Sequence, residues 1–341
     1  MVASSTIRAK ELQRERITGS TLLVRNQIFA EIAQAADIAL PAYENAFNTL
    51  TQSNINPKEI KLITTISRGS SSCATEFLSQ VLTNNPTRTR AIDPALFYDD
   101  EKPSFNQDEI VIALSQSGET GEVVNALKYA SKYTSNTIAI HNSKNSSLST
   151  AAFWDIFLDA GVEKSVPATK SVIAQLAAIL AIHDWFTGTS NKEEISAFTQ
   201  KLTNALAEAD KIQLDPYKVH AVLATKSAIP IAKEIALKMT ELWGTPIWGG
   251  NALEFLHGPI AITRETNNLI FLGDLTQKSL QPLKEKIDLR NLELLQAPYK
   301  TNKISDLLLS LAYWQQVAAN SAINIGVDPA NPFGLSKVTQ T

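Results

Sequence analysis

An apolar segment, a polar turn and a helix-like segment follow one another at residues 110–127. The apolar run IVIAL at 110–114 is typical of a buried strand, and VVNAL at 123–127 is typical of a helix. The turn between them, SQSGET at 115–120, brings four hydroxyl or amide side chains and a glycine to the start of that helix. Free N–H groups at a helix N-terminus attract anions, so such a turn can hold a phosphate without the lysine of a P-loop. The turn therefore predicts a phosphorylated small molecule as the ligand.

A second unit of the same kind lies earlier in the chain. Residues 61–66 (KLITTI) have the pattern of a strand and run into SRGSSS at 67–72, again before a helix-like segment, 74–82. One polar turn by itself is more often a helix cap. Two such turns at the carboxyl ends of parallel strands share one edge of a sheet, where ligands bind in open α/β folds. We therefore expect the phosphate to bind between them, at Gly69, Ser70 and Ser71 of the first turn and Ser115, Gln116, Ser117 and Thr120 of the second.

The composition restricts the kinds of partner that the chain can have. Its 341 residues, 44% of them apolar, can fill two cores. With 31 basic and 34 acidic residues, it has no overall positive field to attract nucleic acid or anionic lipid. No apolar run reaches the ~20 residues that a transmembrane helix needs, and residues 1–30 lack an apolar secretory core. Cys73 is the only cysteine, which excludes an intrachain disulfide and fits a cytoplasmic protein.

Strand and helix patterns alternate along the rest of the chain, as in a parallel sheet. After the first two units, a polar break at 187–192 separates two series of elements, so each half is expected to carry its own sheet. Further strands are expected at 136–140, 153–158, 221–224, 268–272 and 292–295, and further helices at 169–186, 195–209, 231–242 and 307–325. We expect a helical segment over 1–45 that packs across a domain or subunit, a first domain over 46–190 and a second over 191–341.

The expected helix at 231–242 carries three charged residues on one side. Glu234, Lys238 and Glu241 are spaced by four and three residues, so they share one helical face. A carboxylate in a partly desolvated pocket can move a proton between adjacent carbons, because burial raises its pKa toward the working pH. The alternative is a solvated face on which Glu234 pairs with Lys238. The spacing alone leaves both interpretations open.

The sequence gives no indication of a metal or a cofactor. His141, His183 and His220 lack the spacing of metal ligands, and the single cysteine has no neighbouring ligand. We therefore expect neither a metal site nor a cofactor.

Six segments in the same order resemble the double sugar-isomerase (SIS) domain. They look most like the isomerase half of glutamine-dependent glucosamine-6-phosphate synthase and the stand-alone SIS-type glucosamine-6-phosphate deaminases. The segments are the turns at 69–71 and 115–120, SVPATK at 165–170, EIALK at 234–238 with Glu241, EFLHGP at 254–259 and LSKVT at 335–339. The resemblance implies an α/β fold of two SIS domains in tandem, each a flavodoxin-like αβα sandwich around a parallel sheet.

The resemblance also implies roles for single residues. Glu241 matches the catalytic base of the family, and His257 matches the ring-opening histidine that relatives insert into the neighbouring subunit's site, which implies a homodimer. Lys337 matches the C-terminal lysine that meets the sugar carbonyl and can form a Schiff base. The remaining substrate-binding positions implied are Val166, Ala168, Lys238, Glu254 and Ser336.

The expected activity is that of a deaminase. The chain opens without the amino-terminal glutaminase domain of a synthase, so the resemblance implies conversion of glucosamine 6-phosphate to fructose 6-phosphate and ammonia. The alternatives are a fructosamine-6-phosphate deglycase or an aldose–ketose phosphosugar isomerase, and a non-catalytic phosphosugar-binding regulator. The segment 243–250, WGTPIWGG, departs from the family pattern. It is expected to help form the sugar pocket, where its two tryptophans either stack on the ligand or pack an interface.

Overall fold

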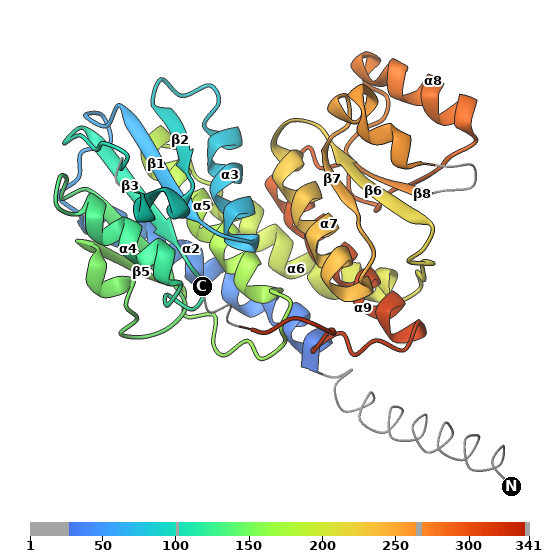
Figure 1. Ribbon diagram of the computed structural model, residues 1–341, viewed down its shortest axis with the longest axis horizontal. Helices are drawn as coiled ribbons and strands as arrows, with labels where there is room; N and C mark the ends of the chain where they lie inside the picture. The colour runs from blue at the N-terminus through green and yellow to red at the C-terminus, as the bar shows by residue number, and fades with distance from the viewer. Residues whose placement is uncertain (1–26, 100–101, 264–267, 338–341) are drawn as a thin grey trace, which may run out of the picture.

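The chain folds around two parallel β-sheets, one in each half (Figure 1). This computed structural model describes residues 27–99, 102–263 and 268–337. The first sheet has the strand order β2-β1-β3-β4-β5 and the second has the order β7-β6-β8-β9. The strands of the first sheet are β1 (Leu62–Ser67), β2 (Arg88–Ile92), β3 (Glu109–Leu114), β4 (Thr137–His141) and β5 (Trp154–Phe157). Those of the second are β6 (Val219–Ala224), β7 (Trp248–Asn251), β8 (Asn268–Leu272) and β9 (Glu293–Leu295). The expected α/β fold with parallel sheets is confirmed.

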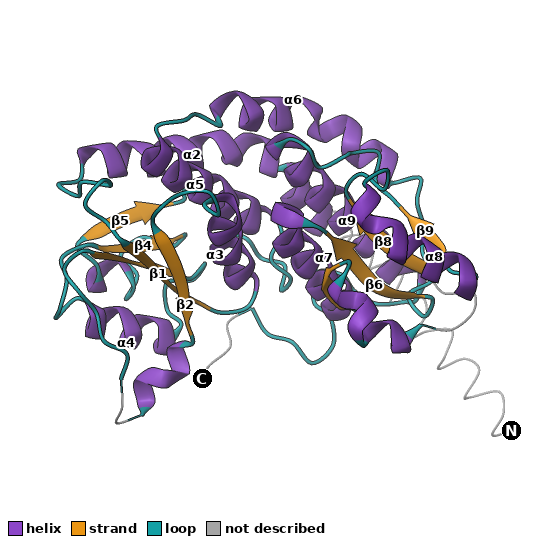
Figure 2. Ribbon diagram, turned by 90° about the horizontal axis from the view of Figure 1, so that it is seen from above, coloured by secondary structure: helices purple, strands orange, loops and turns teal. Residues whose placement is uncertain are grey.

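The helices bury both faces of each sheet, which is why the central strands are apolar throughout. Ile110, Ile112 and Leu114 of β3 face a core between the two sheets, whereas Val111 and Ala113 face the opposite side. The inner core takes residues from both halves, and Figure 2 shows the helices gathered between the sheets. The helices are α2 (Ala35–Gln52), α3 (Ser70–Val81), α4 (Gly121–Ala130), α5 (Lys170–Thr187), α6 (Lys192–Ala209), α7 (Ile229–Trp243), α8 (Gln281–Arg290) and α9 (Ile304–Asn324). Helix α4 covers the outer face of the first sheet, and α8 covers that of the second.

Two strands have no counterpart among the expected elements. β2 is an edge strand whose sequence, RTRAI, begins with three polar residues and so lacks the apolar run of a central strand. β7 is also an edge strand, and its sequence WGGN has two glycines, which weaken any strand pattern. Each is held by pairing with its neighbour, β2 with β1 and β7 with β6. Tertiary pairing therefore decides both edges.

Of the two expected domain boundaries, one falls between two helices and the other falls inside a helix. The polar break at 187–192 lies between α5 and α6. The boundary between residues 45 and 46, however, falls inside α2, an unbroken helix that packs on α5 as part of the inner core. The described part of the expected N-terminal segment therefore contributes to the same core as the first sheet, while residues 1–26 lie outside the described residues.

The register of β1 and β3 positions the two polar turns. Ser67, the last residue of β1, pairs with Leu114, the last residue of β3, so both strands end at the same level. The turns that follow, 67–72 and 115–120, therefore leave the sheet side by side. This is the arrangement that the sequence predicts for a shared anion site.

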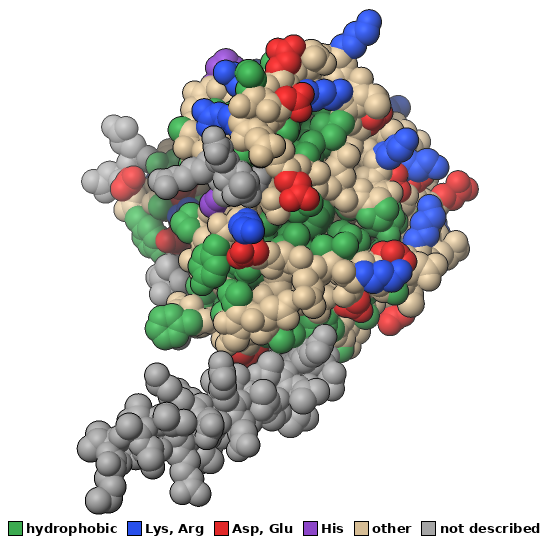
Figure 3. Space-filling view, turned by 90° about the vertical axis from the view of Figure 1, so that its right-hand side faces the viewer, with side chains coloured by type: hydrophobic (Ala, Val, Ile, Leu, Met, Phe, Trp, Pro, Cys, Tyr) green, Lys and Arg blue, Asp and Glu red, His purple; other side chains and the backbone are tan. Residues whose placement is uncertain are grey.

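The surface of the second half mixes charges of both signs. On the face seen in Figure 3, basic and acidic side chains are interspersed rather than gathered by sign. Within residues 27–99, 102–263 and 268–337, no helix combines the length and the apolar character needed to cross a membrane.

Candidate active site

A cavity of about 530 Å³ opens at the edge of the first sheet where β1 and β3 end. It is lined by the two polar turns, by the loop before α5, by one face of α7 and by the C-terminal tail. Thirteen of the expected site residues meet here: Gly69, Ser70, Ser71, Ser115, Gln116, Ser117, Thr120, Val166, Ala168, Lys238, Glu241, Ser336 and Lys337. The fold thus brings together segments from the first half, from α7 and from the C-terminal tail.

The first turn presents the start of α3 to this cavity. Gly69 precedes the helix with φ +55°, a left-handed value that glycine adopts without strain. Two residues further on, the Ser71 hydroxyl accepts a hydrogen bond of 3.2 Å from Nε2 of Gln175 on α5. This bond fixes the hydroxyl beside the N–H groups of the first turn of α3, which makes the site favourable for an anion.

The second turn is organised by hydrogen bonds among its own residues. The Ser115 hydroxyl lies 2.9 Å from the Thr120 hydroxyl and accepts a bond of 3.2 Å from the Gly118 N–H. Gly118 has φ +68°, and a Cβ atom there would lie 2.4 Å from the Ser146 side chain, so only glycine fits. Thr120 is the N-cap of α4, and the turn therefore delivers a second helix N-terminus to the same cavity.

The three charged residues of α7 form a compact cluster. The Lys238 ammonium lies 2.5 Å from Oε2 of Glu241 and 3.7 Å from Oε1 of Glu234. The Glu234 and Lys238 side chains are 0% and 3% exposed, which rules out the solvated face that the spacing left open. Glu241 is partly exposed and faces the cavity.

Burial and the attraction between opposite charges act against each other in this cluster. Burial raises the pKa of Glu234 to about 7, a shift that Lys238 opposes and Glu241 reinforces. For Lys238, burial lowers the pKa, but the attraction of Glu234 and Glu241 outweighs it and the net shift is upward. Lys238 is therefore a buried cation beside Glu241, and it can hold that carboxylate in place while leaving its other oxygen for a substrate.

The C-terminal tail enters the cavity through a buried ion pair. Lys337 donates bonds of 2.7 Å to Oε2 of Glu163 and to the Ser165 carbonyl. Glu163 also accepts bonds from the backbone and hydroxyl groups of Thr169 and Ser171 at the start of α5. Burial would raise the pKa of Glu163, but Lys337 and Ser171 together lower it. The next tail residues of the expected motif, 338–339, lie outside the described residues.

Sequence patterns missed three charged residues at this site, Arg68, Glu122 and Glu163. Glu163 lies in the loop before α5 and reaches Thr169 and Ser171 at the start of that helix only in the fold, so no local pattern marks it. Arg68 lies within the first polar turn and lines the cavity, where its guanidinium pairs with Glu122 at 2.7 Å and with Asp93 at 2.8 Å. Its position between Ser67 and Gly69 was visible in the sequence, but its partners were not.

Two expected residues lie apart from the cavity. Glu254 and His257 belong to a short helix, η4 (Glu254–His257), and both are exposed in this single chain. The departure segment also lies elsewhere, contrary to the expectation that it helps form the pocket. The Trp243 indole donates to the Ala318 carbonyl at 2.9 Å, and Trp248 packs against Phe255 with ring centres 5.3 Å apart. Both tryptophans pack the second half rather than line the described cavity.

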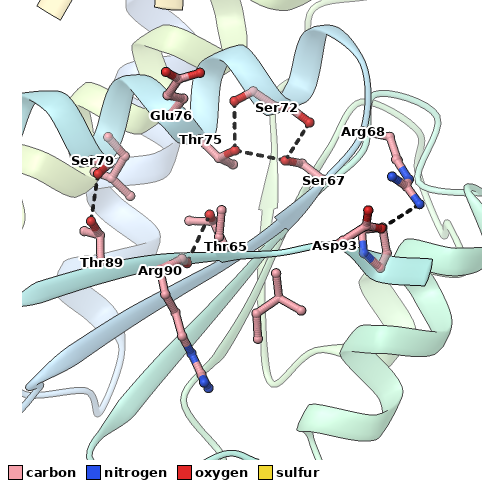
Figure 4. A pocket seen from close by; sticks show the side chains of 14 residues that line it. Thr65, Ser67, Arg68, Ser72, Thr75, Glu76, Ser79, Thr89, Arg90 and Asp93 are labelled. Carbon is pink, nitrogen blue, oxygen red and sulfur yellow. Dashed lines mark hydrogen bonds and ion pairs between the residues drawn. The ribbon is translucent and has the colours of Figure 1, made fainter. Parts of the chain in front are cut away.

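A second, smaller cavity adjoins the first. It has a volume of about 370 Å³ and lies between α3 and the edge strand β2 (Figure 4). Its hydroxyl groups bond one another, Ser67 with Thr75 at 2.9 Å and Ser79 with Thr89 at 2.8 Å. Arg68 lines both cavities.

In the described part of the chain, no group of three or more histidine, cysteine, aspartate or glutamate side chains is placed to hold a metal ion.

The fold and the cavity define a parallel α/β protein with hydroxyl-rich turns at the strand ends and a buried carboxylate–lysine cluster beside them. Residues 59–183 match the family of SIS domains, so the first half of the chain contains an SIS domain. The match covers the first sheet and its two polar turns.

The chain is also similar in sequence to curated proteins. The chain is 30% identical over 213 residues to glutamine–fructose-6-phosphate aminotransferase (isomerizing) of Clostridium tetani, which covers 57% of this chain and 35% of the relative. It is 29% identical over 282 residues to the Helicobacter pylori protein of the same name, which covers 75% of this chain and 46% of the relative. The chain thus spans less than half the length of these relatives.

Solved structures share the fold of both halves. The C-terminal domain of glucosamine–fructose-6-phosphate aminotransferase from Francisella tularensis has a TM-score of 0.72 at 18% identity, covering 87% of this chain and 95% of that one. Glucosamine-6-phosphate deaminase from Thermotoga maritima has a TM-score of 0.72 at 20% identity, covering 90% and 99%. At these identities the likeness establishes the fold alone.

Proposed function

We propose that this chain is an amino-sugar phosphate deaminase that converts glucosamine 6-phosphate to fructose 6-phosphate and ammonia. The observation that carries the proposal is the single cavity in which two hydroxyl-rich helix N-termini face the Glu241–Lys238 pair. The first feature suits a phosphate, and the second suits proton transfer at the other end of a short sugar. The names of the aminotransferase relatives and of the deaminase structure support this chemistry.

In the proposed reaction, the open-chain sugar places C1 and C2 beside Glu241. The Glu241 carboxylate removes the proton from C2, which gives an enol that carries the amino group, and returns a proton to C1. The product is the 2-imine of fructose 6-phosphate, and water hydrolyses it to the ketone and ammonia. Lys238 holds Glu241 through their 2.5 Å contact and offsets its negative charge.

Lys337 is proposed to meet the sugar carbonyl. It lines the cavity and lies on the tail, so it can reach a ligand held between the turns and α7. Its ion pair with Glu163, at 2.7 Å, positions the ammonium to donate a hydrogen bond to the carbonyl oxygen. Attack as a free amine requires that this pair open first.

A second candidate reaction is aldose–ketose isomerisation of another 6-phosphosugar. The same base and the same phosphate site would serve it, and one structure with this fold is described as a putative tagatose-6-phosphate ketose/aldose isomerase from Clostridium novyi, at 18% identity and a TM-score of 0.71. A deglycase acting on fructosamine 6-phosphate and a non-catalytic phosphosugar-binding regulator are the remaining alternatives. The buried cation beside Glu241 favours catalysis over binding alone, since binding does not require a desolvated charge cluster.

The experiment that tests the proposal measures ammonia release from glucosamine, galactosamine and fructosamine 6-phosphates. We expect release from glucosamine 6-phosphate and none from unphosphorylated glucosamine at the same concentration. Ketose formation without ammonia from an aldose 6-phosphate would identify the isomerase instead. Tight phosphosugar binding without any turnover would identify the regulator.

We further propose that the protein works as a homodimer in the cytoplasm, with His257 completing the partner's site. The exposed position of His257, outside its own chain's cavity, supports this arrangement. Mixing inactive His257→Ala chains with inactive Glu241→Gln chains should create heterodimers with one intact site. About a quarter of wild-type activity should return after random exchange, by the symmetry of a two-fold interface. If the subunits exchange and no activity returns, His257 does not act in trans.

A further inference from the structure

Arg68 occupies the wall between the two cavities. It follows β1 and precedes Gly69, so it adjoins the expected phosphate site. Its Nε and Nη2 atoms bond Glu122, at 2.8 and 2.7 Å, and Nη2 also lies 2.8 Å from Asp93. Figure 4 shows the pair that Arg68 forms with Asp93. Among the described residues, Nη1 makes no such bond, so two donors of the guanidinium remain for a ligand.

Arg68 is also the most accessible of the cations that line the larger cavity. Its side chain is 42% exposed, whereas those of Lys238 and Lys337 are 3% and 25% exposed. Lys238 is paired with Glu241, which lines the cavity, and Lys337 is paired with the buried Glu163. A phosphate between the two polar turns would otherwise meet only neutral hydroxyls and helix N-termini, although it carries about two negative charges near neutral pH.

The two carboxylates that hold Arg68 differ in exposure. Glu122 is 15% exposed and lies in the first turn of α4, next to the N-cap Thr120 of the expected phosphate site. Asp93 is 56% exposed and lies on the far side, at the wall of the smaller cavity. Glu122 therefore fixes the guanidinium beside the phosphate turn, while the Asp93 pair, being largely solvated, is weak.

We propose that Arg68 is a further phosphate ligand, and that Asp93 competes with the phosphate for its guanidinium. This inference rests on the proposed function and assigns the recognition of the phosphate group to a residue outside the serine turns. In the complex, Nη1 donates to a phosphate oxygen, Glu122 keeps its bonds to Nε and Nη2, and the contact with Asp93 lengthens. A planar guanidinium suits this task because it can bond a carboxylate and a phosphate at the same time.

A purely structural role makes different predictions. If Arg68 only ties β1 to α4 and to the segment at Asp93, then removing either partner would weaken the fold and affect every ligand alike. If Arg68 binds phosphate, then loss of the Arg68 guanidinium would weaken binding and loss of the Asp93 charge would strengthen it. Both effects would be confined to phosphorylated ligands. The substitution Asp93→Asn is well suited to this comparison. The Asp93 side chain accepts a bond of 2.9 Å from the Ala95 N–H as an N-cap, and asparagine can keep that bond while losing the charge.

The test is calorimetric titration of the full chain with glucitol 6-phosphate, which has no carbonyl and cannot react, and with glucitol. We expect Arg68→Gln to weaken binding of glucitol 6-phosphate roughly tenfold to a hundredfold, the range for a lost hydrogen bond to a charged group. Asp93→Asn should strengthen it by up to about fivefold, as expected from an exposed ion pair. The double variant should match Arg68→Gln, because Asp93 acts only through Arg68. Arg68→Lys, which keeps the charge but loses the planar fork, should fall between wild type and Arg68→Gln.

Three results would overturn the inference. The first is Arg68→Gln with wild-type affinity for glucitol 6-phosphate while Ser117→Ala loses affinity, which would refute the role of Arg68 and leave the phosphate site standing. The second is equal weakening by Arg68→Gln and Asp93→Asn, which would indicate a structural tie. The third is wild-type protein that binds no phosphosugar at all, which would refute the proposed function itself.

Discussion

The two halves of this chain share an architecture but differ in what they bring to the cavity. In the first half, β1 and β3 end in turns of hydroxyl residues that line it. In the second half, β6 and β8 end at equivalent places, yet the residues that follow them, 225–228 and 273–277, do not line the described cavity. The second half contributes instead the side of α7 and the C-terminal tail. One half offers strand ends and the other offers a helix face.

This difference shows that the strand ends of a parallel sheet line a cavity only where another part of the molecule packs beside them. Helices α3 and α7 pack against each other, tied at the surface by Lys233 and Glu76 at 2.7 Å. That contact turns the charged face of α7 toward the turns of the first half. The first half is thus suited to hold an anion and the second to move a proton, and the two roles should be separable by substitution.

The largest effect is expected for Glu241, the proposed base in the second half. Glu241→Gln keeps the shape and the contact with Lys238 but removes proton acceptance, so kcat should fall by roughly two to four orders of magnitude while KM changes little. Steady-state ammonia release measures both constants. The control is Glu208→Gln, which alters an exposed glutamate of α6. Wild-type turnover in Glu241→Gln would refute the division of roles between the halves.

The next largest effect concerns the ion pair that joins the tail of the second half to the first. Lys337→Met leaves Glu163 buried without its cation, which should cost about 3–5 kcal/mol of folding free energy near pH 7. In the wild type the pKa of Glu163 is lowered, so its stabilisation is present above the ordinary glutamate pKa and is lost as the pH falls through the lowered value. In the variant, burial raises that pKa, and stability should increase as the pH falls from 7 toward 5.

Thermal unfolding at pH 5 and pH 7 measures this reversal. Lys211→Met is the matched control, because Lys211 pairs with Glu208 at 2.6 Å on the surface, where both side chains are exposed. It should change the melting temperature little at either pH. A Lys337→Met variant that behaves like this control would show that the tail adds nothing to the first half.

A smaller effect, confined to pH dependence, is expected at Glu234. Its pKa is about 7 in the fold, raised by burial, against 4.5 for an ordinary glutamate. Between these values the folded chain holds a proton that the unfolded chain has released, so Glu234 stabilises the fold below about pH 4.5 and this contribution is lost as the pH rises through 7. Glu234→Gln should remove that dependence. Its stability relative to wild type should rise by about 3 kcal/mol from pH 4 to pH 8, measured by urea unfolding. Parallel pH curves for the two proteins would contradict the raised pKa.

The smallest effect is expected for single hydroxyls of the turn at 115–120, which is proposed to bind the phosphate. Ser117→Ala should raise KM for the phosphosugar about tenfold and leave kcat nearly unchanged, as for loss of one hydrogen bond to a charged group. Ser227→Ala, in the equivalent position after β6, is the control from the second half and should leave both constants unchanged. Equal changes in the two variants would mean that the halves do not differ in anion binding.

The sequence went furthest where function follows from local order. Apolar strands, polar turns and helix starts lie within a few residues of one another, so the turns at 67–72 and 115–120 and the charged face of α7 were predictable, and they line one cavity. The edge strands β2 and β7 were not predictable, because their residues carry no strand pattern and depend on pairing with β1 and β6.

By itself, then, the sequence determined the parallel α/β class, the strand-end turns and the identity of most residues that line the cavity. The tertiary structure alone decided how they are charged and held. Lys337 meets Glu163 across 174 residues, and Arg68 meets Glu122 across 54, separations over which no periodicity carries information. Burial decided that Glu234 and Lys238 form a desolvated cluster rather than a solvated face. Pair contacts and desolvation arise only when distant segments pack, so the chemistry of the site depends on the fold. The location of the site was predictable because the turns follow their strands directly in the chain.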